Sequence, residues 1–177
     1  GSDYIVFTDG YSDWGNLSLQ FHNISSQQEI RIYQSDDNGS TFQDFRHNIA
    51  NIYHPVSGNV MRHIALVRGA PSGGYSQWRL YLDGSYVTPT SGTGHQTTIG
   101  NLPTVDIGGQ AWTMGRPPNY PAAYNYDGQI DEFRVSLTDQ IYTGTGSYDI
   151  PTAPFTLPSP TTELYMMDGS GTETKLT

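Results

Sequence analysis

The chain has 177 residues, of which 35% are hydrophobic, and it contains 20 glycines, 11 prolines and no cysteine. This length corresponds to a single domain, and a composition rich in glycine and proline argues against a helical bundle. The absence of cysteine excludes disulfide bonds, thiolate zinc sites and a cysteine nucleophile. Eight basic and 17 acidic residues give a net charge of −9, which opposes a polyanionic partner, so nucleic acid is not expected as a ligand. No apolar run approaches the roughly 18 residues of a membrane span, so membrane insertion is not expected either.

Short runs in which apolar and polar residues alternate predict β-strands. In chain order these runs are residues 4–8, 17–21, 30–33, 61–68, 78–82, 105–107, 130–135 and 164–166. The pair Asp83-Gly84 is typical of a tight hairpin, because both residue types tolerate the positive φ values that such a turn requires. Trp14 and Trp78 lie within the strand pattern and are expected in the core. One helical turn is expected at residues 137–142, but no helical periodicity extends further, so the pattern predicts an all-β protein with two antiparallel sheets.

Two polar stretches, residues 89–103 and 110–126, are predicted as long loops, and loops of that length usually carry function. The second stretch is rich in aromatic residues, which disfavours disorder. Residues 151–160 form a proline-rich connection, and residues 163–168 behind it are expected to form one more strand. We therefore expect a single domain over residues 1–177.

Four segments resemble, in order, motifs of the laminin-G-like group of concanavalin A-like jelly rolls. They are residues 61–68 (MRHIALVR), 78–84 (WRLYLDG), 105–109 (VDIGG) and 127–135 (DGQIDEFRV). Residues 3–6, Trp14 and residues 17–21 resemble the opening of this family, and residues 142–144 with 151–155 resemble tails common in phage and bacterial surface members. The resemblance covers nearly the whole chain and implies an antiparallel β-sandwich of jelly-roll type. It also implies recognition of carbohydrate or protein at an extracellular or virion surface.

The last strand departs from the order of this family. Residues 163–169 (ELYMMDG) resemble the strand that normally precedes residue 3, yet they stand at the other end of the chain. Either a boundary between tandem copies or a circular permutation would produce this order. Because an unpaired sheet edge favours aggregation, we expect residues 164–167 to fill the edge beside the terminal strands.

A catalytic carboxylate pair is not evident in the sequence. Retaining glycosidases of the jelly-roll fold carry Glu-x-Asp-x-Glu or a close variant on one strand, which sets two carboxyl groups about 5 to 5.5 Å apart. No such string occurs, and the adjacent pair Asp131-Glu132 would point to opposite faces of a strand. The chain is therefore not expected to be an enzyme.

Three aspartates, Asp3, Asp127 and Asp131, are the candidate ligands for calcium. Hard carboxylate oxygens suit this cation, and the first and last strands would bring the three residues together. In laminin-G-like domains calcium commonly sits at the rim of the sandwich, so the resemblance implies the same cofactor here. The alternative is structural: Asp131 accepts backbone N–H bonds, and Glu132 pairs with an arginine.

The aromatic stretch at residues 110–126 is the candidate ligand site. A sugar ring needs an aromatic platform for its C–H face and fixed polar groups for its hydroxyls, and this stretch contains both kinds. The candidate residues are Trp112, Arg116, Asn119, Tyr120, Tyr124 and Tyr126. The alternatives are a protein interface and a loop that folds back to cover one end of the sandwich.

Pattern and resemblance together predict a non-catalytic carbohydrate-binding or adhesion module, for example of a phage tail fibre or a secreted bacterial protein. Its expected partner is a glycan or host surface receptor, with other copies or neighbouring fibre domains as further partners. A structural domain that makes protein contacts in a virion or fibre is the first alternative. A glycoside hydrolase of the same fold is the second.

Overall fold

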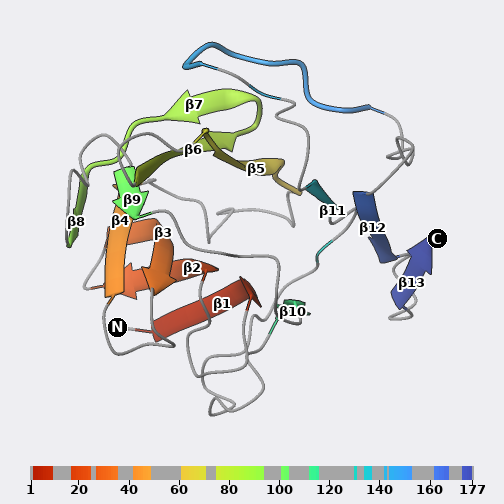
Figure 1. The fold of residues 1–177 in the computed structure, drawn as a ribbon, viewed down its shortest axis with the longest axis horizontal. Helices are drawn as coiled ribbons and strands as arrows, with labels where there is room; N and C mark the ends of the chain where they lie inside the picture. The colour runs from red at the N-terminus through yellow and green to blue at the C-terminus, as the bar shows by residue number, and fades with distance from the viewer. Residues whose placement is uncertain are drawn as a thin grey trace.

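The computed structural model describes residues 2–9, 17–24, 27–35, 42–48, 61–70, 75–93, 101–103, 112–115, 130, 134–136, 142, 144–152, 162–167 and 173–176. Every regular element in these ranges is a strand, and every strand pair is antiparallel. Among these residues no helix is long and apolar enough to cross a membrane. The prediction of an all-β protein with antiparallel sheets is therefore confirmed for the part of the chain that the structure describes (Figure 1).

The largest sheet has six strands in the order β10-β1-β2-β3-β4-β8. Its members are β1 (Ser2–Asp9), β2 (Leu17–Ile24), β3 (Gln27–Ser35), β4 (Phe42–Asn48), β8 (Ser91–Thr93) and β10 (Trp112–Met114). Strands β1 to β4 follow one another in sequence and in space, so this part is a simple antiparallel meander.

A second sheet contains β5 (Ile64–Arg68), β6 (Tyr75–Leu82) and β7 (Ser85–Val87), and β9 (Asn101–Pro103) also pairs with β6. A third sheet has three strands in the order β11-β12-β13. These are β11 (Arg134–Ser136), β12 (Thr162–Met167) and β13 (Glu173–Leu176). Strand β12, which contains residues 164–167, pairs with β11 and β13, whereas β1 pairs with β2 and β10. The expected position of residues 164–167 beside the first strand was therefore wrong, because β10 occupies that edge.

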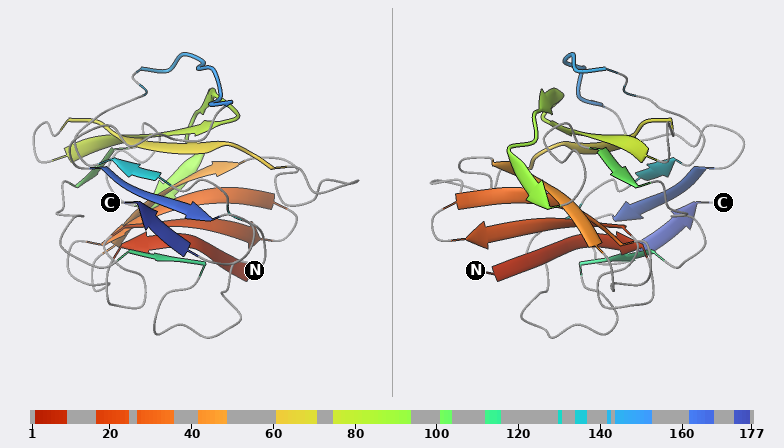
Figure 2. Two further views of the ribbon diagram at one scale, coloured as in Figure 1. Left: turned by 90° about the vertical axis from the view of Figure 1, so that its right-hand side faces the viewer. Right: turned by 60° about the vertical axis from the view of Figure 1, so that its left-hand side comes forward.

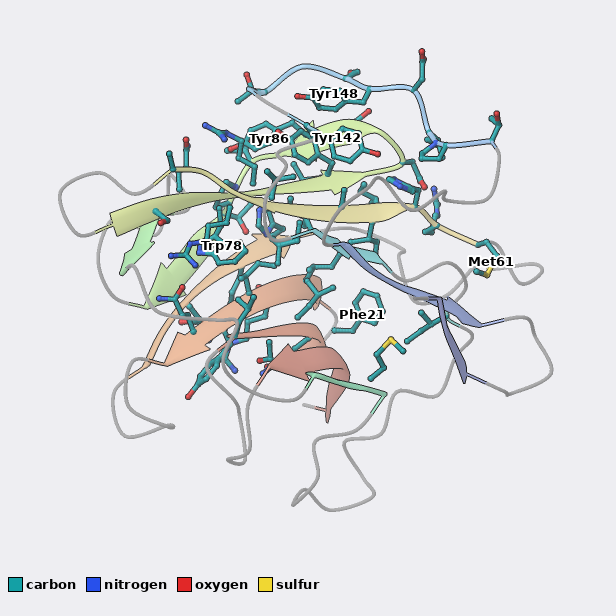
Figure 3. The ribbon with its side chains drawn as sticks, turned by 45° about the vertical axis from the view of Figure 1, so that its right-hand side comes forward. Phe21, Met61, Trp78, Tyr86, Tyr142 and Tyr148 are labelled. Carbon is teal, nitrogen blue, oxygen red and sulfur yellow. The ribbon has the colours of Figure 1, made fainter. Side chains whose placement is uncertain are left out.

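The hydrophobic core lies between the six-stranded sheet and the β5–β7 sheet, which form successive layers in Figure 2. Side chains alternate between the two faces of a strand, so every second residue of β2 and β3 faces the core. The buried cluster comprises Leu17, Leu19, Phe21, Ile30, Ile32, Trp78 and Leu80. Trp78 and Phe21 lie between the two layers in Figure 3, and the prediction of Trp78 as a core residue is confirmed.

Alternation located most of the longer strands but missed the shorter ones. The expected strands at residues 4–8, 17–21, 30–33 and 78–82 lie within β1, β2, β3 and β6. The sequence pattern missed β4 and β7, and the expected loop at residues 89–103 contains β8 and β9. The expected loop at residues 110–126 begins with β10, so both loop predictions were wrong over these three-residue strands. Such strands are too short to show a period, and their pairing with longer neighbours defines them.

The remaining strand predictions are shifted or untested. The run at residues 61–68 becomes a strand only from Ile64, and the run at 130–135 corresponds to β11, which begins at Arg134. The predicted strand at residues 105–107 and Trp14 lie outside the described residues, as do residues 137–141 of the expected helical turn.

Candidate functional site

The predicted glycan-binding residues fall largely outside the described part of the chain. Trp112 is the first residue of β10 and pairs with Asp9 of β1, but its side chain is not among those described. The other five candidates, Arg116, Asn119, Tyr120, Tyr124 and Tyr126, lie outside the described residues. Their role as a sugar platform stays a prediction.

The predicted calcium ligands also fall largely outside the described part of the chain. Asp3 lies in β1 opposite His22 of β2, with its side chain not described, and Asp127 and Asp131 lie outside the described residues. Among the described residues, no group of three or more His, Asp or Glu side chains is placed to hold a metal ion. The fit of the three aspartates to calcium is therefore untested, and calcium stays a prediction.

A different aromatic group gathers on the outer face of the β5–β7 sheet. We call it the tyrosine cluster, and it consists of Tyr81 on β6, Tyr86 on β7, and Tyr142 and Tyr148 from the later part of the chain. Figure 3 shows Tyr86, Tyr142 and Tyr148 together on the side of this sheet that faces away from Phe21. Tyr81 is buried at the centre, and the other three tyrosines are half-buried.

Ring packing holds the four tyrosines in fixed relative positions. The Tyr81 ring centroid lies 5.8 Å from that of Tyr86, 5.7 Å from that of Tyr142 and 5.1 Å from that of Tyr148. The Tyr142 and Tyr148 centroids are 4.7 Å apart with an interplanar angle of 60°. Tilted and edge-to-face contacts at these distances are the favourable arrangements of aromatic pairs.

The hairpin turn between β6 and β7 explains why two of these rings meet. Asp83 and Gly84 have φ values of 48° and 75°, so the tight turn predicted from the Asp-Gly pair is confirmed. This turn sets Leu82 opposite Ser85 and therefore Tyr81 opposite Tyr86, on the face away from the core. Local sequence alone thus fixes this half of the cluster.

The other half is fixed by an extended segment, residues 144–152, which we call the strap. The Tyr148 N–H donates to the Gly84 carbonyl at 2.7 Å, and the Tyr81 hydroxyl donates to the Gly144 carbonyl at 2.5 Å. A side chain at Gly84 would put its Cβ 2.1 Å from the Tyr148 carbonyl oxygen. The strap therefore lies on the hairpin as closely as backbone atoms permit.

The Tyr81 hydroxyl at the centre of the cluster is neutral. Burial, reinforced by the neighbouring Tyr148, raises the pKa of Tyr81 to about 12. The Tyr81 hydroxyl therefore keeps its proton at every physiological pH and remains available as the donor to Gly144.

Polar groups border the cluster at the start of β5. The His63 ring lies edge-on to Tyr142, with centroids 6.3 Å apart, and its backbone N–H donates to the Asp83 carboxylate at 3.0 Å. Arg62 forms an ion pair with the same carboxylate. Burial lowers the pKa of His63 despite the opposing effect of Asp83. Its Nδ1 is buried and has no hydrogen-bond partner among the described residues.

Sequence reasoning missed the tyrosine cluster, although part of it was accessible. A two-residue Asp-Gly turn sets the residues two positions before and after it opposite each other, which gives Tyr81 and Tyr86. Tyr142 and Tyr148 carry no local pattern that leads to β6. No family model, curated protein or solved structure matches this chain.

Proposed function

We propose that the chain is a non-catalytic carbohydrate-binding module with a jelly-roll β-sandwich of laminin-G-like type, acting at an extracellular or virion surface. The motif resemblance supports the sandwich, together with the antiparallel sheets and the core between two of them. The proposed ligand is a neutral glycan, because the net charge of −9 repels strongly anionic chains.

The observation that carries this proposal is the tyrosine cluster. A sugar presents apolar C–H faces and a rim of hydroxyls, so its sites combine an aromatic platform with fixed polar groups. Tyr86, Tyr142 and Tyr148 are half-buried, which leaves part of each ring open to a ligand. The Asp83 carboxylate and the His63 ring stand beside this platform as hydrogen-bonding groups.

Substitution of Tyr142 tests this site. On an array of immobilised neutral glycans, we expect Tyr142→Ala to weaken binding by about tenfold, because the stacking face is lost. Tyr142→Phe keeps the ring and should stay within about twofold of the wild type. The melting temperature of each variant checks that the fold is intact.

Two results would overturn the assignment. One is unchanged binding by a folded Tyr142→Ala variant. The other is loss of binding in Trp112→Ala alone, which would move the platform to residues 110–126. Absence of binding to every glycan on the array would refute carbohydrate recognition itself.

Protein assembly is the second candidate function, and two exposed apolar side chains favour it. Met61 is 57% exposed just before β5, and Ile150 is 41% exposed in the strap. Exposed apolar side chains contribute to protein contacts where they form a continuous patch. Light scattering of the wild type and of a Met61→Ser, Ile150→Ser double variant distinguishes this function, because only an assembly through these residues would dissociate.

A further inference from the structure

The face of the six-stranded sheet that points away from the core carries a row of polar side chains. Strand register sets Gln20 of β2 opposite Arg31 of β3, and Arg31 opposite Arg46 of β4. We call these three residues the arginine row. Ile30 and Ile32, on either side of Arg31, face the core, so the row lies on the opposite surface of the sheet.

Two guanidinium groups on neighbouring strands repel each other, and one buried carboxylate offsets this repulsion. Asp44 Oδ2 accepts from Arg31 Nε at 2.7 Å and from Arg46 Nε at 2.9 Å. Glu29 lies 3.7 Å from Arg46 Nη1. Burial alone would raise the pKa of Asp44, but the two arginines hold that pKa below its ordinary value. Asp44 is therefore an ionised anchor for both arginines.

The anchor uses only part of each guanidinium. A guanidinium carries five N–H donors, and Asp44 engages the Nε donor of Arg31 and of Arg46. Among the described residues, the hydrogen bond from the Arg31 guanidinium to an acceptor is the one from Nε to Asp44. The Arg31 guanidinium lies over the Tyr33 ring, 5.2 Å from its centroid, which restricts its orientation. Both arginines thus keep Nη donors that Asp44 does not use and that could bind a ligand.

The row is recessed, and it opens toward Arg46. The Arg31 side chain is 11% exposed and the Arg46 side chain 25% exposed, whereas Asp44 beneath them is fully buried. A ligand that reaches the row would therefore meet the terminal nitrogens of both arginines and not the carboxylate.

Gln20 supplies an independent indication of a ligand. Its side chain is fully buried, and its Nε2 donates to Ser18 Oγ at 2.8 Å. Its Oε1, however, has no hydrogen-bond partner among the described residues. A buried acceptor without a donor is costly, and a bound group that donates to it would remove this cost. An acceptor opposite Arg31, with Arg46 on the next strand, matches a ligand that carries an anionic group near a hydroxyl.

We propose that the arginine row binds a uronic acid residue of a glycan, with the sugar carboxylate on the Nη donors of Arg31 and Arg46 and a sugar hydroxyl donating to Gln20 Oε1. A planar carboxylate fits the guanidinium fork. The four charged side chains at the row sum to zero and the whole chain is negative, so a single carboxylate is favoured over a densely sulfated or phosphorylated chain. This site lies on the other sheet from the tyrosine cluster and does not rest on it.

Calorimetric titration of the full chain with galacturonate, which carries one carboxylate, and with its methyl ester tests the proposal. We expect saturable binding of the acid that weakens as salt is added, and at least tenfold weaker binding of the neutral ester. Equal binding of acid and ester would overturn the proposal, as would the absence of saturable binding. Competition by equimolar inorganic sulfate would also overturn it, because it would indicate an anion site without sugar recognition.

Three variants locate the site. Arg46→Lys keeps the charge but loses the fork, and it should weaken binding of the acid by about tenfold. Gln20→Met removes both the unpartnered oxygen and the Nε2 donor to Ser18, and it should weaken binding of the acid by a few fold. The matched control Arg68→Lys, on β5 of the other sheet, should leave binding unchanged. A row with a structural role alone predicts unaltered binding of the acid by a folded Gln20→Met variant.

These results are separable from those of the tyrosine cluster. Tyr142→Ala should not alter titration with galacturonate, and Arg46→Lys should not alter binding to neutral glycans. If neutral glycans fail to bind but galacturonate binds and responds to Arg46→Lys, the tyrosine assignment is wrong and the arginine row stands.

Discussion

Gly84 occupies a position where an L side chain meets two separate penalties. Its φ is +75°, and a Cβ there would lie 2.1 Å from the Tyr148 carbonyl oxygen. Left-handed backbone is strained for alanine, and a contact this short forces the strap to move. We expect Gly84→Ala to lower the free energy of unfolding by about 2 to 4 kcal/mol, measured by urea denaturation.

Two other glycines serve as controls for this substitution. Gly144 has a φ of +82° but open space around its Cα, so Gly144→Ala reports the backbone strain alone. Gly146 has open space and no such φ, and Gly146→Ala should stay within about 0.5 kcal/mol of the wild type. If Gly84→Ala and Gly144→Ala prove equal, the close approach of the strap contributes nothing to stability.

At the scale of elements, hydrogen bonds join the strap to the β6–β7 hairpin. The Tyr81 hydroxyl donates to the Gly144 carbonyl, and the Tyr148 N–H donates to the Gly84 carbonyl. Tyr81→Phe removes the first bond and keeps the ring packing. We expect a loss of about 1 kcal/mol in local stability and about fivefold faster hydrogen exchange at the Tyr148 amide.

The Gly69 amide provides the internal reference, because it donates to the Gln77 carbonyl at the other end of β6. Its exchange rate should not change in Tyr81→Phe. Equal acceleration at both amides would mean that the substitution destabilises the whole sheet, and the strap would then not be a separate local unit.

At the scale of the molecule, a buried histidine links stability to pH. His47 of β4 is fully buried, and burial lowers its pKa to about 4, although the neighbouring backbone of Ile30 and Val87 partly offsets this effect. Val87 belongs to β7, so the His47 ring lies where the two sheets meet. Protonation of this ring is therefore unfavourable in the folded state, because the charged ring would be buried between the sheets.

The sign of the pH dependence follows from the lowered pKa. Above the ordinary histidine pKa of 6.5 both states are neutral, so His47 adds no pH dependence. Between pH 6.5 and about 4 the unfolded chain takes up a proton that the folded chain does not, and stability falls as the pH falls. By the lower end of this window we expect a loss of about 3 kcal/mol in urea denaturation.

A His47→Gln variant isolates the contribution of this residue. Burial also lowers the pKa of His63, which acts in the same direction, so the share of His47 is the difference between wild type and variant. Asp44 has a lowered pKa and contributes only at more acidic pH, below its ordinary value of 3.8. An equal decline in both proteins between pH 6.5 and 4 would contradict the assignment to His47.

The sequence predicted the features of this fold that depend on neighbouring residues better than those that depend on distant segments. Alternation identified β2 and β3 because their core residues recur at every second position, as in Leu17, Leu19 and Phe21. The same pattern did not reveal that Ser18 and Gln20, on the other face of β2, are buried as well. Burial of a polar residue depends on which other segments pack over it, and a local sequence pattern does not indicate these segments.

The sequence by itself determined the β class, the main strands and the Asp83-Gly84 turn, since each follows from side-chain alternation or from the φ values that two adjacent residues tolerate. Only the tertiary structure decided the tyrosine cluster and the arginine row. The Tyr81 hydroxyl and its acceptor on Gly144 are 63 positions apart in the chain. Arg31 and Arg46 face each other only because β3 and β4 adopt one register among several. Packing selects that register by burying the apolar face, and the polar sites are formed on the opposite face as a consequence.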